Sequence, residues 1–151
     1  MYEWLLAAHI LGAVTWIGGS LTLLLLGSRA RRSQNPTLLA SFARDAAWIG
    51  QRVYMPASVV VLVAGLALVA VGRWPYESLW IGIGLVAVIV SALTGALFVG
   101  PELGRVGKLI AERGPDEAHV ASRMDRILTV SRIELIVLFL VVIDMAVKPG
   151  A

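Results

Sequence analysis

The sequence contains no cysteine, which excludes disulfide bonds, thiolate metal sites, cysteine nucleophiles and c-type haem attachment. Charged residues are also scarce. They make up 15% of the 151 residues, whereas a soluble domain carries about 25%. Hydrophobic residues account for 58% of the chain, so we expect an integral membrane protein rather than a soluble domain with a large core.

Four hydrophobic segments are long enough to cross a bilayer as helices, since about 20 apolar residues span its hydrocarbon core. They cover residues of about 4–26, 53–71, 79–100 and 127–147. We therefore predict an all-α fold in which residues 1–151 form one membrane domain, a bundle of four transmembrane helices.

Two long connections join these spans. Asn35 followed by Pro36 is the pattern of a helix start, with Asn35 as the N-cap, and the apolar residues after it recur at helical spacing. This predicts an amphipathic helix on the membrane surface or under the spans. Residues 102–126 carry charges of both signs around an apolar stripe, and Gly114-Pro115 marks a turn. We expect this second connection to form a helical hairpin that projects from the membrane.

The basic residues indicate how the spans are oriented. Ten of the 13 lysines and arginines lie in the two long connections. Positively charged connections stay on the cytoplasmic side, so we expect both termini to be extracytoplasmic in the inner membrane. Because topology accounts for the basic charge, we expect the lipid bilayer as the partner, and no nucleic acid.

His9 is the ionisable residue inside the first span, roughly 7 to 8 Å from its start. An ionisable residue within a membrane is a functional-site hypothesis. An imidazole can ligate a metal or haem iron, relay a proton or hydrogen-bond a neighbouring helix, and the residues alone leave these alternatives open. Trp16 lies on the same face, away from the interfacial belt where Trp is commonest. We expect it to be buried against other helices or a flat ligand.

Glu134 is the acidic residue deepest in the fourth span, roughly 10 Å along the helix. Arg132 is two residues away and projects to nearly the opposite side, so it is not a suitable partner. We therefore predict that Arg52 or Gln51, at the start of the second span, pairs with Glu134.

Asp144 lies near the end of the same span, four residues before Lys148. A pair at this spacing contributes below about 0.5 kcal/mol, whereas a carboxylate at mid-membrane costs about 2.5 to 3.5 kcal/mol or more. We therefore predict that Asp144 and Lys148 form a pair near the membrane interface.

Three stretches carry a resemblance to a known superfamily. AHILGAVTWIGG, from Ala8 to Gly19, resembles the first-span pattern of HemJ-type protoporphyrinogen oxidases, of CopD copper-resistance proteins and of a related family of predicted integral membrane proteins of unknown function. Residues 51–56 resemble the basic-aromatic stretch and proline that open their second span. Residues 147–149 resemble the Lys-Pro that closes their last span. The length and the ending from Asp144 to Gly150 fit the family of unknown function best.

The resemblance implies a four-helix membrane bundle and, in the oxidases, b-type haem held by histidine, with electrons passed to the respiratory chain. Those oxidases carry another histidine toward the end of the third span, where this chain reads Leu97 to Pro101. Ligation by two histidines of one molecule is therefore not expected. Methionine can be an axial ligand, and Met145 lies at a depth near His9. The chain lacks the cluster of Met, His and Cys ligands that copper transport requires.

Three functions stay open at this stage. The first is binding of a hydrophobic ligand, haem b or a porphyrin, between spans one and four, and its enzymatic form would be a haem-linked membrane oxidoreductase. The second is a role as an accessory subunit or scaffold in a homo-oligomer or larger membrane complex. The third is transport of an ion or small solute. No phosphate-binding loop or nucleophile motif is present, so a binding or structural role is expected before catalysis. The residues assigned to the ligand site are His9, Trp16, Met145, Arg52 and Lys148, and those assigned to a transport path are His9, Glu134 and Asp144.

Overall fold

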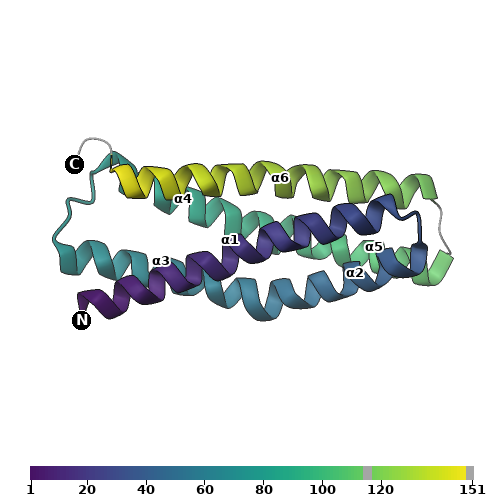
Figure 1. Cartoon of the computed structure of the whole chain (residues 1–151), viewed down its shortest axis with the longest axis horizontal. Coiled ribbons are helices and arrows are strands. Elements are labelled where there is room, and N and C mark those ends of the chain that lie inside the picture. Colours follow the sequence, from purple (N-terminus) through teal and green to yellow (C-terminus); the bar gives the residue numbers. More distant parts are fainter. Residues whose placement is uncertain (114–116, 149–151) are drawn as a thin grey trace.

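In the computed structural model the chain forms four long helical rods that lie side by side (Figure 1). The structure describes residues 1–113 and 117–148, and within them every regular element is helical. The rods are α1, then α2 continued through η1 into α3, then α4 continued through η2 into α5, and finally α6. Their bounds are α1 Tyr2–Arg32, α2 Pro36–Ile49, η1 Gly50–Tyr54, α3 Met55–Gly72, α4 Leu79–Thr94, η2 Gly95–Val99, α5 Gly100–Arg113 and α6 Glu117–Val147.

The start of the second rod is as the sequence predicts. The side chain of Asn35 accepts a hydrogen bond of 3.1 Å from the backbone N–H of Leu38, and Pro36 takes the first helical position, where its missing N–H costs nothing. The amphipathic helix that follows is α2, which packs against α1 and α5 and runs directly into α3.

The two middle rods stay continuous because each contains one wide turn. η1 and η2 are π-helical segments, and each begins with a glycine six residues before a proline, Gly50 before Pro56 and Gly95 before Pro101. Proline has no N–H to donate and its ring crowds the carbonyl four residues earlier. The chain accommodates this by widening the preceding turn rather than by ending the helix.

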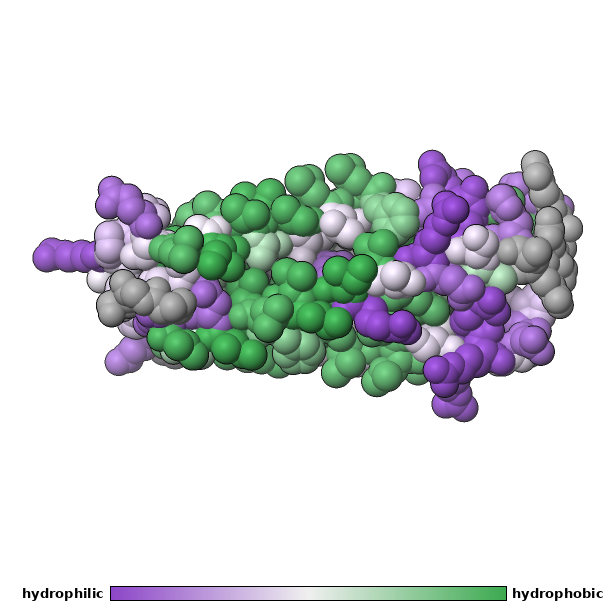
Figure 2. Space-filling view, turned by 90° about the horizontal axis from the view of Figure 1, so that it is seen from above, coloured by the Kyte–Doolittle hydropathy of each residue, from purple (hydrophilic) through white to green (hydrophobic). Residues whose placement is uncertain are grey.

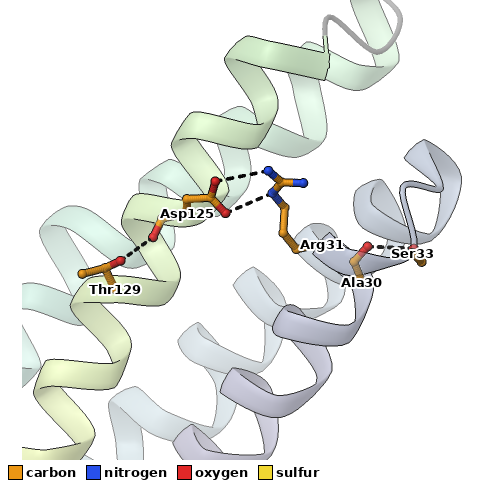
Figure 3. A network of polar contacts seen from close by, with 5 residues as sticks. All are labelled: Ala30, Arg31, Ser33, Asp125 and Thr129. Atoms are coloured by element: carbon orange, nitrogen blue, oxygen red, sulfur yellow. Dashed lines mark hydrogen bonds and ion pairs between the residues drawn. The ribbon is translucent and has the colours of Figure 1, made fainter.

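The largest cluster of buried side chains lies at the end of the bundle where the basic residues gather, which we call the basic end. Ala43 of α2, Val106 of α5 and Met124 of α6 are fully buried there. Arg31 of α1 also makes two hydrogen bonds to Asp125 of α6, of 3.0 and 3.2 Å (Figure 3). The predicted turn at Gly114-Pro115 lies outside the described residues. On either side of it, α5 and α6 pack with α1 and α2 around this cluster.

The middle of the molecule is an apolar belt between hydrophilic ends (Figure 2). Many large apolar side chains in the belt are exposed, such as Leu11, Val63 and Phe139. Of the described rods, three are long and apolar enough to cross a membrane: Tyr2–Arg32, Pro36–Gly72 and Leu79–Glu112. The apolar stretch of α6 carries three charged residues, which are Arg132, Glu134 and Asp144.

Candidate functional site

A pocket of about 490 Å³ lies between the rods, where the apolar belt meets the basic end. Every rod contributes residues to its walls, and both π-helical segments line it. The space exists because small residues face one another here. Three of the lining glycines, Gly50, Gly95 and Gly104, would each meet nothing within 4 Å if they carried a Cβ atom.

Other glycines in the same bundle have the opposite role, since side chains fill the space beside them. A Cβ atom on Gly19 would collide with the ring of Tyr54, and one on Gly27 would approach the ring of Phe42 to within 2.9 to 3.0 Å. These close contacts hold α1 against the second rod at the level of the pocket, which both rings line. Glycines of this bundle therefore provide open space at some positions and close helix contact at others.

A polar strip runs along the inner wall of the pocket. Ser58 and Ser91 are almost fully buried, and the Ser58 hydroxyl donates to the carbonyl oxygen of Met55 at 2.8 Å. The Ser91 hydroxyl faces the half-buried carboxyl group of Glu134 across the gap between α4 and α6. Polar groups inside an apolar pocket fix the orientation of a ligand.

The partner predicted for Glu134 is only partly where the sequence suggested. Gln51 lines the same pocket as Glu134. Arg52 does not line it and lies exposed on the outer face of η1. Within residues 1–113 and 117–148, no ion pair joins Glu134 to Arg52. Ser91 is the polar side chain that faces the carboxyl group.

The exposed lining residues show where the pocket opens. All of these exposed residues belong to the second and third rods, close to the π-helical turn that each of the two rods contains. The pocket therefore opens sideways rather than along the bundle axis. Two basic side chains, those of Arg105 and Lys108, lie at this opening. The exposed residues that line the pocket are Gln51, Met55, Pro101, Arg105 and Lys108.

His9 lies outside this pocket and joins two helices. Its Nδ1 is 2.9 Å from the carbonyl oxygen of Val61 in α3. A carbonyl can only accept, so Nδ1 carries the proton. Gly65 leaves the space for the ring, because a Cβ atom there would lie 3.1 Å from the imidazole. The sequence left metal ligation, proton relay and a hydrogen bond to a neighbouring helix open for His9. The observed contact is the third of these.

Trp16 is buried as expected and does line the pocket. It packs in a cluster with Ala57 and Val61 of α3 and Val88 of α4. One side of the indole is therefore fixed by helix packing, and the residue forms part of the pocket wall beside Ser20.

The other end of the bundle, near both termini, holds the remaining predicted site residues. The ammonium group of Lys148 lies 4.4 Å from the ring centroid of Trp74 and 5.5 Å from that of Trp80. No ion pair joins Lys148 to Asp144 in the described part of the chain. Instead Asp144 Oδ2 and Trp80 Nε1 are buried with no hydrogen-bond partner among the described residues.

A haem between His9 and Met145 would require both side chains to face one space. The contacts of His9 are with α3, whereas the Met145 methyl group packs onto Gly84 of α4. Neither residue lines the pocket. The two side chains do not form a ready axial pair, and haem binding through His9 stays a prediction.

The sequence led us to expect a ligand site between spans one and four, and both of these rods line the pocket, but the opening between the second and third rods was not predicted. The signal that could have found it is the repeated spacing of a glycine six residues before a proline, in Gly50–Pro56 and Gly95–Pro101. π-Helical turns within long helices occur frequently at functional sites. Two such turns on adjacent rods would have indicated a functional site at the depth where the pocket lies.

A family model described as "Predicted integral membrane protein (DUF2269)" matches residues 3–149. No curated protein and no solved structure matches the chain. The family description gives a membrane location and no activity.

Proposed function

The chain belongs to this DUF2269 family of integral membrane proteins, and we propose that it binds an amphiphilic molecule, with an anionic head and an apolar body, in the pocket between its rods. One observation carries this proposal. The pocket opens sideways between η1 and η2, with Arg105 and Lys108 at the opening and an apolar interior behind them.

The chemistry of the walls indicates the class of ligand. A volume of about 490 Å³ is within the range of roughly 300 to 1,000 Å³ of small-molecule sites. Leu23, Leu24 and Leu128 give the interior apolar surface, which suits an alkyl or ring body. Lys108 supplies positive charge that an anionic head needs, and Arg105 adds to it although its guanidinium also pairs with Glu102.

The orientation of the ligand follows from the two kinds of polar group. Glu134 and the apolar walls face the interior, where burying a charged head without a cationic partner is unfavourable. The anionic head therefore stays at the opening with Arg105 and Lys108. A hydroxyl or amide on the body of the ligand can instead donate to Glu134 or Ser91.

We propose that α6 crosses the membrane as a fourth span, in spite of its charges. Glu134 faces the pocket. Arg132 is exposed near the basic end, where its long side chain can extend to the interface. Asp144 is three residues from the end of the helix. The positive-inside rule then gives an inner-membrane protein with α2, α5 and the start of α6 in the cytoplasm and both termini outside.

The test compares probes with the same dodecyl chain and different heads: dodecyl phosphate, dodecyltrimethylammonium and dodecyl maltoside. Retention on the full chain in nanodiscs is measured by native mass spectrometry. Dodecyl phosphate should be retained best. Because a hydrogen bond to a charged group contributes about 1.5 to 3 kcal/mol, Arg105→Gln with Lys108→Gln should weaken it by roughly tenfold or more.

The matched control is Arg73→Gln, an exposed arginine at the far end of the bundle. It should leave retention of dodecyl phosphate unchanged. Equal retention of all three probes, or equal loss in Arg73→Gln and in the pocket variant, would refute an anion-selective pocket.

The relation to the HemJ and CopD superfamily, and haem b or a porphyrin as ligand, remain secondary proposals that rest on the His9 to Gly19 pattern. Reconstitution with haem tests them, because a Soret band that His9→Ala abolishes would favour a haem-linked oxidoreductase. Transport has less support, since Glu134 lines the pocket but His9 and Asp144 do not. An accessory subunit in a homo-oligomer or larger complex is compatible with ligand binding in this pocket.

A further inference from the structure

Three exposed residues follow one another at four-residue intervals along the second rod: Arg44 and Trp48 on α2 and Arg52 on η1. We call them the basic-aromatic stripe. Residues four apart lie on the same face of a helix. Trp48 is 60% exposed, although indole rings are usually buried or placed at interfaces. The buried face of α2 is a different one, formed by Leu39, Ala43 and Ala46.

The stripe crosses the boundary between the apolar belt and the basic end. The ring of Tyr54 packs over Gly19 of α1, and the ring of Phe42 packs over Gly27. Arg44, Trp48 and Arg52 lie between Phe42 and Tyr54 on the second rod. They are therefore at the same height in the bundle as residues 19–27 of α1, where the apolar segment of α1 ends. On the second rod itself, exposed apolar side chains follow the stripe at Val53 and Val59.

Among the described residues, neither arginine of the stripe has a partner for its guanidinium group. Within residues 1–113 and 117–148, Arg44 and Arg52 take part in no ion pair and no side-chain hydrogen bond. The neighbouring carboxylate of Asp45 is exposed as well, but it projects about 100° around the helix from Arg44. The stripe keeps an excess of positive charge at the level where a leaflet presents its headgroups.

We propose that the basic-aromatic stripe is a binding site for one anionic phospholipid, whose phosphate lies between the Arg44 and Arg52 guanidinium groups. Guanidinium groups hold phosphate oxygens through paired hydrogen bonds. The indole of Trp48 lies at headgroup level, where such rings are favoured. The acyl chains extend along Val53 and Val59 into the apolar belt. This site lies on the outer surface of the rod and does not depend on the pocket.

The test is a competition between phosphatidylglycerol and phosphatidylcholine with identical acyl chains, added in equal amounts to the detergent-solubilised full chain. Native mass spectrometry counts the lipids that remain bound. The unaltered protein should retain one phosphatidylglycerol in preference to phosphatidylcholine. Arg44→Gln with Arg52→Gln should reduce that preference roughly tenfold or more, since each basic residue near an anionic surface contributes severalfold.

Two comparisons make the result decisive. Arg29→Gln with Arg32→Gln removes the same charge from exposed positions on α1 and should keep the preference. An equal loss in this control would overturn the proposal in favour of general charge attraction, and an unchanged preference in the Arg44 and Arg52 variant would overturn it outright. Helix content measured by circular dichroism shows that both variants are folded.

A third comparison separates a lipid from a free phosphate ester. Glycerol 3-phosphate carries the head without the chains and should not displace phosphatidylglycerol at millimolar concentration. Displacement by glycerol 3-phosphate would overturn the assignment of the site to a membrane lipid.

Discussion

The imidazole of His9 in α1 and the carbonyl of Val61 in α3 are joined by a hydrogen bond of 2.9 Å within the apolar belt. The bond ties the first two rods together at a depth where water cannot replace it. It also accounts for Gly65, whose missing side chain leaves room for the ring.

His9→Ala should therefore destabilise the bundle by about 0.5 to 2 kcal/mol, the range found for hydrogen bonds between membrane helices. Thermal unfolding in detergent measures the change. Leu11→Ala, an exposed position two residues away, is the control and should have a smaller effect. A histidine whose removal leaves the unfolding temperature unchanged would not have this structural role.

The contact between Gly19 and Tyr54 gives a second prediction. Gly19→Ala places a Cβ atom against the ring of Tyr54 and should cost about 1 to 3 kcal/mol through overpacking. The neighbouring Gly18 has nothing within 4 Å of its Cβ position, so Gly18→Ala should be neutral or slightly stabilising. Equal unfolding temperatures for the two variants would contradict the packing of α1 against the second rod.

Filling the pocket gives a third prediction. Gly95→Leu directs a side chain into open space in the pocket and should lower retention of dodecyl phosphate by at least roughly tenfold, with stability changed by less than about 0.5 kcal/mol. Gly107→Leu is the control, because Gly107 also has open space beside it and does not line the pocket. If both variants retained the probe equally well, the pocket would not be its binding site.

The ammonium group of Lys148 over the rings of Trp74 and Trp80 gives a fourth prediction. Lys148→Met should destabilise the end of the bundle near the termini by about 0.5 to 1 kcal/mol, as expected for an exposed cation–π contact. Lys148→Arg should retain most of the stability. Tryptophan fluorescence monitored during unfolding measures both, and identical curves for the Met variant and the unaltered protein would contradict the contact.

Several features of the fold could be predicted from the sequence because they depend on local patterns. Long apolar runs predict the membrane helices, and three rods meet this expectation. The Asn35 cap follows from the residue types at the helix start. The burial of Trp16 follows from its depth in the membrane.

The site could not be predicted in the same way, because it depends on how distant residues pack. A proline after a polar segment is compatible with a helix start or a kink, and only the packed bundle shows that Pro56 follows a wide turn within a continuous rod. Ser58 and Ser91 are ordinary small residues in sequence, and both become pocket walls when the rods meet. Arg52 or Gln51 was expected to pair with Glu134. Gln51 lines the pocket together with Glu134, whereas Arg52 is exposed and does not.

The most direct measurement of the proposed function is photo-crosslinking with a dodecyl phosphate that carries a diazirine at the end of its chain. Peptide mass spectrometry of the labelled protein identifies the residues that the chain reaches. Label on pocket-lining residues, such as Trp16, Leu24 and Leu135, and its loss in Gly95→Leu are the predicted result. Label confined to exposed positions of the apolar belt, such as Ile133 and Ile136, would contradict ligand binding in the pocket.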